Sequence, residues 1–214
     1  YTDRKILPVI INVHGGGLII GNKEFNRYFC ALLCKKGFLV YSIEYRLIPD
    51  CLIYDQIADV FMAMDYIKER LAADGGDSSH VYMAGDSGGA CLITYANAIQ
   101  NSTNIARAAN VTPSGLRINA LGLISGMFYT SRFDKIGLFL PKYLYGRDYK
   151  KTSFAKYVNP ENRELLNSLA PVWLVTSHND FLRRYTTDFE KALTRAEREH
   201  ELVVFPKNKK LTHA

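Results

Sequence analysis

The stretch Gly85-Asp86-Ser87-Gly88-Gly89 decides how this chain folds. It follows the apolar run Val81–Gly85 and opens a small-residue segment that continues to about Ile99, so it joins a predicted strand to a predicted helix. A serine in such a tight turn is held in a strained backbone conformation, and the flanking glycines let strand and helix approach closely. The alternative is an accidental glycine-rich turn, but the strand–helix context argues against it. We therefore predict that Ser87 is a nucleophile, with a helix N-terminus nearby that favours developing negative charge.

A second glycine-rich segment, His14-Gly15-Gly16-Gly17, comes directly after the predicted strand Val9–Val13. Consecutive glycines let backbone N–H groups point at a substrate oxygen. A plain turn is one alternative, and a phosphate-binding loop is another, although neither G-x-x-x-x-G-K-[ST] nor G-x-G-x-x-G is present. Because loops of this type accompany the serine turn in lipases and esterases, we predict an oxyanion hole. Its expected donors are the N–H groups of Gly15, Gly16 and Gly88.

Short β-rich runs alternate with longer helical segments along the chain. Near-continuous apolar strands separated by helices indicate a parallel sheet covered on both faces. The sequence therefore predicts an α/β fold with a mostly parallel central sheet flanked by helices. The predicted strands are Val9–Val13, Phe38–Tyr45, Val81–Gly85, Ile118–Ile124, Val172–Thr176 and Glu201–Phe205, and the predicted helices are Phe25–Lys36, Tyr54–Ala72, Gly88–Ile99 and Leu182–Arg198.

Residues 127–169 interrupt this alternation with about forty residues rich in aromatic side chains. A connection of that length between two strands is usually functional. We expect a cap or lid over the site, although the aromatics could simply pack a small helical subdomain, and both can hold together. The expected division is a core of residues 1–126 and 170–214 and an insertion of residues 127–169.

The acid partner of Ser87 should lie just after a later strand, because nucleophile, acid and histidine follow one another along chains with this serine turn. Asp180 meets this condition, since it follows Val172–Thr176. Asp188 falls inside the next helix, and Asp134 and Asp148 fall in the insertion. Asp180 could alternatively cap the helix that begins at Leu182, and one carboxylate could do both.

The base should follow the last predicted strand, Glu201–Phe205. His213 does, whereas His200 precedes that strand and His80 precedes the strand that leads to Ser87, so both lie at the opposite edge. His178 breaks the expected order, and we expect it to support the site from behind. His14 is expected to brace the glycine loop. The predicted triad is Ser87, Asp180 and His213.

Together these residues resemble the hormone-sensitive-lipase-like carboxylesterase family of the α/β-hydrolases. The resemblance rests on five motifs, which span nearly the whole chain: His14-Gly15-Gly16-Gly17, Tyr45-Arg46-Leu47-Ile48-Pro49-Asp50, Gly85-Asp86-Ser87, Asp180-Phe181-Leu182-Arg183 and His213. Gly88 and Arg184 depart from the family, which usually has Ala and Asp there, but neither change removes a catalytic group.

The resemblance implies an α/β-hydrolase fold with a helical cap, a preference for short-chain acyl esters, and neither a metal nor an organic cofactor. It also implies an N-terminal cap segment with two early strands, and a helix after the histidine. None of these fits between the motifs and the ends of the chain, so we expect both ends to be incomplete. Because position 1 is not Met, a signal peptide could also lie outside the sequence.

The amino-acid composition limits the classes of binding partner that we expect. With 48% hydrophobic and 22% charged residues in 214, the chain is typical of a globular protein, and no run approaches the ~20 apolar residues of a membrane span. The net charge of +6 comes from scattered pairs and small clusters of Lys and Arg, without a nucleic-acid-binding motif. Four cysteines without a CxxC pair favour a reducing, cytoplasmic location. We expect a small-molecule ester as partner, no nucleic acid and no stable membrane insertion, and leave a homodimer open.

The expected activity is hydrolysis of short-chain carboxylic esters through an acyl-enzyme. Two alternatives remain: an amidase or formamidase that uses the same triad, and a ligand-binding member of the fold without turnover.

Overall fold

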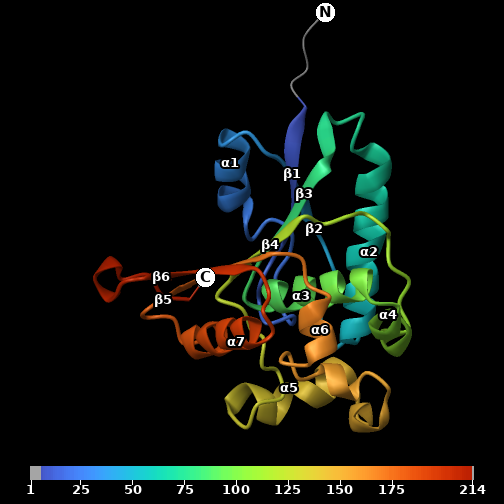
Figure 1. Ribbon diagram of the computed structural model, residues 1–214, viewed down its shortest axis with the longest axis vertical. Helices are drawn as coiled ribbons and strands as arrows, with labels where there is room; N and C mark the ends of the chain where they lie inside the picture. Colours follow the sequence, from blue (N-terminus) through green and yellow to red (C-terminus); the bar gives the residue numbers. More distant parts are fainter. Residues whose placement is uncertain (1–5, 214) are drawn as a thin grey trace, which may run out of the picture.

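The central element of the protein is a parallel β-sheet. The computed structural model describes residues 6–213, and within them six strands form one sheet in the order β2-β1-β3-β4-β5-β6 (Figure 1). All five neighbouring strand pairs are parallel, which confirms the predicted α/β class. The strands are β1 (Leu7–Val13), β2 (Leu39–Ile43), β3 (Gly76–Asp86), β4 (Ala120–Ile124), β5 (Val172–Ser177) and β6 (His200–Phe205).

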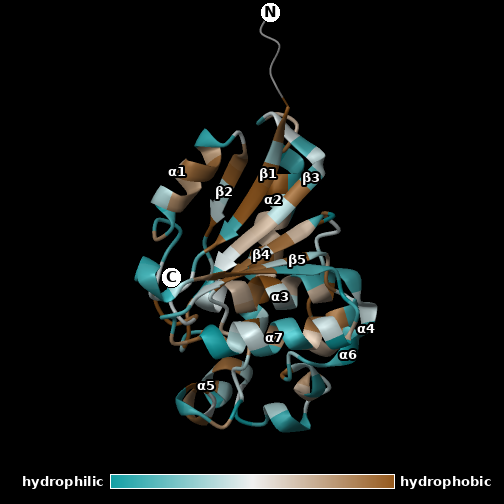
Figure 2. Cartoon of the chain, turned by 60° about the vertical axis from the view of Figure 1, so that its left-hand side comes forward, coloured by the Kyte–Doolittle hydropathy of each residue, from teal (hydrophilic) through white to brown (hydrophobic). Residues whose placement is uncertain are grey.

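Helices connect the strands, because parallel neighbours cannot be joined by a tight turn. Hydrophobic residues concentrate in the strands, and hydrophilic residues lie on the outer helices and loops (Figure 2). The helices are α1 (Arg27–Lys35), α2 (Ile53–Arg70), α3 (Ser87–Asn101), α4 (Thr103–Ala109), α5 (Lys135–Tyr145), α6 (Arg163–Asn167) and α7 (Arg183–Arg195), with short 3-10 turns η1 (Tyr149–Lys151), η2 (Ala155–Tyr157) and η3 (Lys207–Lys209).

The two faces of the sheet are covered unequally. Alternate residues of β1 such as Val9 and Ile11 are completely buried on the face that packs against α3, and α3 itself is buried along almost its whole length. On the opposite face, α1 lies beside Ile10, and a wide apolar groove remains in which Trp173 of β5 is 46% exposed. The prediction that helices flank the sheet is confirmed, with one face covered only in part by the described residues.

Close packing between α3 and the sheet explains the glycines around Ser87. A Cβ on Gly89 would lie 2.2 Å from the carbonyl oxygen of Val13, and a Cβ on Gly85 would lie 2.8 Å from the backbone of Gly89. Only glycine allows this approach, so the first turn of α3 sits directly against the end of β1. The glycine loop and the Ser87 turn are thereby brought together.

Most predicted strand boundaries differ from the observed ones by one or two residues, but β3 begins five residues before the predicted Val81. The reason is tertiary: Gly76 pairs with Leu7 across an irregularity in the β1–β3 register. The short helices α4 and α6 were not predicted, since seven and five residues carry too little periodicity.

The insertion, residues 127–169, leaves the sheet after β4 and returns to it at β5, and it contains α5, η1, η2 and α6. It lies at one end of the molecule, below the carboxyl edge of the sheet in Figure 1. Leu144, Tyr145, Phe154 and Tyr157 join it to the main hydrophobic core. Its aromatic residues therefore anchor the insertion as well as shape its surface.

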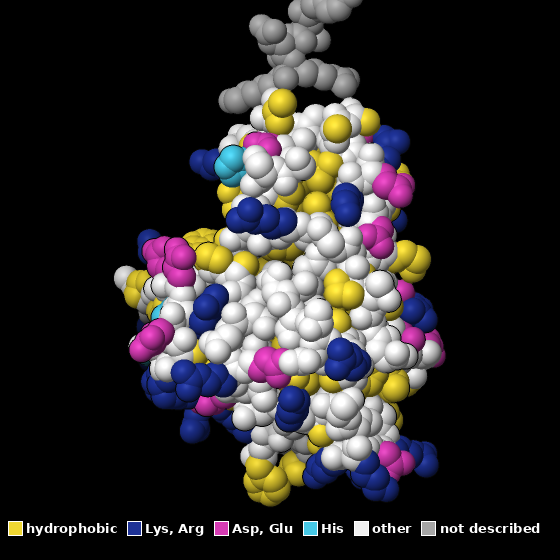
Figure 3. All heavy atoms as spheres, turned by 45° about the vertical axis from the view of Figure 1, so that its right-hand side comes forward, with side chains coloured by type: hydrophobic (Ala, Val, Ile, Leu, Met, Phe, Trp, Pro, Cys, Tyr) yellow, Lys and Arg dark blue, Asp and Glu magenta, His cyan; other side chains and the backbone are white. Residues whose placement is uncertain are grey.

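Charged groups are dispersed over the surface. On the face in Figure 3, Lys and Arg side chains are interspersed with acidic and neutral ones, and hydrophobic side chains stand exposed at the lower end, where the insertion lies in Figure 1. Between residues 6 and 213, no helix combines the length and apolar character needed to cross a membrane.

Candidate active site

Ser87 is the first residue of α3 and follows β3 directly. Its φ of +49° lies in the left-handed region, which a non-glycine residue adopts only under strain. The side chain is nearly buried, with 7% exposed. The strained turn is the conformation that the sequence predicted for this position.

Asp180 and His213 come together at Ser87 from two different loops. The His213 Nε2 atom lies 2.9 Å from the Ser87 hydroxyl, and its Nδ1 lies 2.8 Å from Asp180 Oδ1. Asp180 follows β5 and His213 follows β6, so three separate strand ends supply the three side chains. In this arrangement the carboxylate orients the imidazole, and the imidazole can accept the serine proton.

The environment of Asp180 favours its ionised form. Burial by itself raises the pKa of this carboxyl. Hydrogen bonds from His213 and from the Leu182 amide outweigh burial, with further help from Ser125 and Thr176, so the pKa lies below its usual value. The Leu182 amide donates a hydrogen bond of 2.8 Å to Asp180 Oδ1, so Asp180 also satisfies a backbone donor just before α7.

Two contacts hold His213 and the segment before it. The Ser177 hydroxyl donates to the carbonyl of Leu211 at 2.6 Å, which ties the segment before His213 to the end of β5. The Phe181 ring centre lies 4.3 Å from that of His213. Neither contact could be read from a motif, because both depend on how two distant loops meet.

In the glycine loop, the Gly15 N–H has a different partner from the one that the sequence predicted. The Gly15 N–H donates to Asp86 Oδ1 at 3.0 Å, and the same oxygen accepts from Asn26 at 2.7 Å. The expected role of Gly15 as an oxyanion donor is therefore corrected, since its amide is already occupied. The backbone turns sharply at the next two residues, with φ of +96° at Gly16 and +64° at Gly17.

Gly88 packs against this loop. A Cβ at position 88 would lie 2.9 Å from the Leu18 nitrogen and 3.2 Å from the Gly17 carbonyl carbon. The departure from the family's alanine at this position thus has a steric cause in this chain. The Gly88 amide also lies in the first turn of α3, where N–H groups have no partner within the helix.

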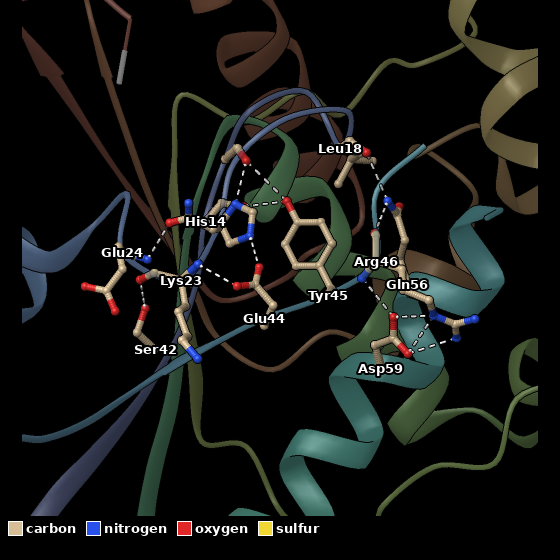
Figure 4. A network of polar contacts seen from close by, with 12 residues as sticks. His14, Leu18, Lys23, Glu24, Ser42, Glu44, Tyr45, Arg46, Gln56 and Asp59 are labelled. Carbon is tan, nitrogen blue, oxygen red and sulfur yellow. Dashed lines mark hydrogen bonds and ion pairs between the residues drawn. The ribbon is translucent and has the colours of Figure 1, made fainter. Parts of the chain in front are cut away.

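His14 and Tyr45, which lie beside one another in Figure 4, hold the other side of Gly15. The Gly15 carbonyl accepts from His14 Nδ1 at 2.9 Å and from the Tyr45 hydroxyl at 3.2 Å, and the two rings stack 4.3 Å apart. His14 Nε2 lies 3.2 Å from a carboxylate oxygen of Glu44. Burial raises the pKa of Tyr45 well above its usual value, so its hydroxyl remains a donor. His14 therefore braces the loop, as the sequence predicted.

The far end of the loop is held by the segment after β2 (Figure 4). The Leu18 carbonyl accepts from the Gln56 side chain at 3.0 Å and from the Ile48 amide at 3.0 Å. Gln56 also bonds the Arg46 carbonyl, and the Arg46 side chain pairs with Asp59 of α2. The Tyr45–Asp50 motif thus connects the glycine loop to α2.

The remaining histidines lie elsewhere. His178 was expected to support the site, but its ring is exposed and contacts the Arg183 side chain at 2.6 Å, so that prediction is wrong. His80 pairs with Asp77, and His200 bonds the Arg198 carbonyl. Over residues 6–213, no three His, Cys, Asp or Glu side chains gather in a way that could hold a metal ion.

Comparisons with known proteins support the α/β-hydrolase fold. A family model described as alpha/beta hydrolase fold matches residues 10–213. A probable isoprenylcysteine alpha-carbonyl methylesterase, ICME, from Oryza sativa subsp. japonica is 28% identical over 174 residues, covering 76% of this chain and 42% of that protein. Tuliposide A-converting enzyme b1, amyloplastic, from Tulipa gesneriana is 30% identical over 120 residues, which cover 51% of this chain and 32% of that protein. The chain spans less than half the length of these curated relatives.

Solved structures share the fold. Esterase B from Lactobacillus rhamnosis superposes with a TM-score of 0.88 at 23% identity, covering 97% of this chain and 68% of that one. A bacterial heroin esterase superposes with a TM-score of 0.73 at 26% identity, and the match covers 97% of this chain and 67% of that one.

Proposed function

The chain belongs to the α/β-hydrolase fold family, and from that membership we propose that it is a serine esterase that cleaves short-chain carboxylic esters through an acyl-enzyme. The observation that carries the proposal is the pair of contacts at His213, 2.9 Å to Ser87 and 2.8 Å to Asp180. The relative named as a methylesterase supports a role on esters.

In the proposed mechanism, His213 takes the proton from Ser87 as the hydroxyl oxygen attacks the ester carbonyl. The carbonyl π electrons move to oxygen and form the tetrahedral oxyanion. As the oxyanion collapses, the C–O bond to the alcohol breaks, and His213 Nε2 gives its proton to the leaving oxygen. Water then attacks the acyl-enzyme by the same route and releases the acid. Asp180 holds the Nδ1–H tautomer of His213 and stabilises its cationic form.

The proposed oxyanion donors are the N–H groups of Gly16, Gly17 and Gly88. Gly15 is left out because Asp86 takes its amide. The left-handed backbone at Gly16 and Gly17 supports this choice, since it turns the chain back toward the start of α3. Loss of one such donor typically lowers kcat about 10²–10³-fold.

We assign residues 127–169 as a cap over the site. In support, the Met127 amide donates to the Ser87 carbonyl at 3.0 Å, so the insertion begins beside the nucleophile.

The test is replacement of the nucleophile. Ser87→Ala is expected to lower the hydrolysis of p-nitrophenyl butyrate by about 10⁴-fold or more and to abolish covalent labelling by a fluorophosphonate. Ser131→Ala is the matched control, because Ser131 is an exposed serine in the insertion, and it should keep wild-type rates. Undiminished activity of Ser87→Ala would refute the mechanism.

The same assay separates the alternatives. Turnover of p-nitroanilides or aryl formamides in preference to the matching esters would identify an amidase or formamidase. Binding of esters without turnover would identify a ligand-binding member of the fold.

A further inference from the structure

The insertion contacts α7 through polar and charged side chains that the proposed mechanism does not use. α7 lies beside the insertion in Figures 1 and 2, and the hydroxyl of its residue Tyr185 donates to Asp134 Oδ2 at 2.6 Å. The other oxygen of Asp134, Oδ1, accepts from the amides of Ile136 and Gly137 in the first turn of α5. One carboxylate therefore fixes the start of α5 and joins it to α7.

The Tyr185 side chain is buried and attached to the insertion a second time. The guanidinium carbon of Arg132 lies 3.8 Å from the Tyr129 ring centre and 5.2 Å from that of Tyr185. Arg132 also pairs with Asp188 of α7 at 2.9 Å. Attraction between a cation and an aromatic ring is stronger where water is excluded, and both tyrosines are buried. Burial raises the pKa of Tyr185 above its usual value, so its hydroxyl remains a donor.

Tyr185 is also bonded to the segment that carries Asp180. The Tyr185 amide donates to the Leu182 carbonyl at 2.8 Å, and the Leu182 amide donates to Asp180 Oδ1 at 2.8 Å. The same oxygen, Oδ1, lies 2.8 Å from His213 Nδ1. A continuous series of hydrogen bonds therefore runs from Asp134 in the insertion to His213.

The two carboxylate oxygens of Asp180 are held by different elements. Oδ2 accepts from the Thr176 hydroxyl at 2.8 Å, so β5 fixes it. Oδ1 depends on the Leu182 amide, whose position follows the first turn of α7, because only residues 178–182 separate β5 from α7. A displacement of that turn would rotate the carboxylate about the oxygen that β5 holds, and would change the distance from Oδ1 to His213.

We propose that the contact between Asp134 and Tyr185 positions Asp180 for the reaction, so that the proposed triad is aligned only while the insertion is attached to α7. Asp134 and Tyr185 are positioning residues, since they act on His213 through Leu182 and Asp180. The inference rests on the proposed esterase function. It gives the insertion a part in the chemical step, in addition to its proposed role as a cap.

Two single variants and their combination test the contact. Tyr185→Phe keeps the ring and removes the hydroxyl, and it should lower kcat for p-nitrophenyl butyrate about 10-fold with KM within about 2-fold, because a small misplacement of a catalytic group affects the transition state more than binding. Asp134→Ser keeps an N-cap oxygen for α5 and removes the acceptor of Tyr185, so it should cause the same loss. The double variant should lose no more than either single variant, since one contact is broken in all three.

Tyr157→Phe is the matched control. Tyr157 is a completely buried tyrosine of the insertion, and its hydroxyl donates to Glu164 Oε2 at 2.7 Å, but Glu164 belongs to α6. The variant therefore loses the same kind of hydrogen bond without breaking a contact to α7. Its urea midpoint should fall about as much as that of Tyr185→Phe, whereas its kcat should stay within about 2-fold of wild type.

A second readout needs no substrate. The low-field proton NMR signal of the His213 Nδ1–H reports its hydrogen bond to Asp180. This signal should shift or broaden in Tyr185→Phe and stay unchanged in Tyr157→Phe.

Wild-type kcat in Tyr185→Phe would overturn the inference, as would an equal loss of kcat in Tyr157→Phe. Losses that multiply in the double variant, or a raised KM at unchanged kcat, would also overturn it. These outcomes still leave a working esterase. Failure of the proposed function is recognised separately, by full activity of Ser87→Ala or by no turnover of any ester, and the NMR comparison then still tests the contact: an unchanged signal in Tyr185→Phe would refute it.

Discussion

At the scale of single residues, the glycine loop, which is the proposed oxyanion hole, depends on groups that never need to touch the substrate. The Gly15 peptide is held on both sides, by Asp86 at its N–H and by His14 and Tyr45 at its carbonyl. This double attachment fixes the orientation of the peptide that follows, whose N–H belongs to Gly16. Asp86 is therefore a positioning residue in the proposed mechanism.

Removal of the Asp86 carboxylate tests this role. Asp86→Ala should lower kcat by about 10- to 100-fold with a smaller change in KM, because a loop displaced by about 1 Å stabilises the transition state poorly. The measurement is steady-state kinetics with the active sites titrated. Asp86→Asn keeps an acceptor oxygen for the Gly15 amide and should stay within about 3-fold of wild type. Equal losses in the two variants would argue against an acceptor role.

At the scale of elements, the contact between α3 and β1 positions Ser87. The glycine on either side of the turn is required by distance, as the Gly89 contact with Val13 shows most directly. A side chain there must push the helix away from the strand, and Ser87 moves with the helix. Stability and activity should therefore change together at this position.

Gly89→Ala is expected to lower the free energy of unfolding by about 1–3 kcal/mol, the usual range for overpacking. Urea denaturation monitored by circular dichroism would measure it. Gly122→Ala on β4 is the matched control, since a Cβ there would meet its nearest atoms only at 3.8 Å, an ordinary contact. A Gly89→Ala variant as stable as wild type would mean that α3 can shift at no cost.

At the scale of the whole molecule, Asp180 links the proposed site to global stability. Its pKa is lowered on folding from an ordinary value of 3.8, so the ionised form favours the folded state. The stabilisation is fully present above the unfolded pKa and is lost as the pH falls through the lower, folded pKa.

Asp180→Asn should therefore be less stable than wild type at pH 7, by about 1.5–3 kcal/mol for hydrogen bonds to a charged group. The difference should shrink as the pH falls below about 4, where the unfolded wild-type carboxyl is protonated. Urea unfolding at pH 7 and at acid pH measures both values. A difference that is constant with pH would show that the carboxylate charge contributes nothing to folding.

The protein family and the fold class could be predicted from the sequence because short local motifs identify them. The resemblance to hormone-sensitive-lipase-like carboxylesterases, based on motifs between His14 and His213, is confirmed by the family match over residues 10–213. The short-chain preference implied by that resemblance stays a prediction.

What the sequence determined by itself were features that follow from local periodicity and backbone geometry: the alternation of strands and helices, the strained turn at Ser87, and the order in which Asp180 and His213 follow it. Tertiary structure alone decided which donors are free and which groups are engaged. It turned Gly15 toward Asp86, placed His178 beside Arg183, and extended β3 back to Gly76. The physical reason is that a hydrogen bond or a cavity wall depends on two segments meeting, and the partner of Gly15 lies 71 residues away in the chain.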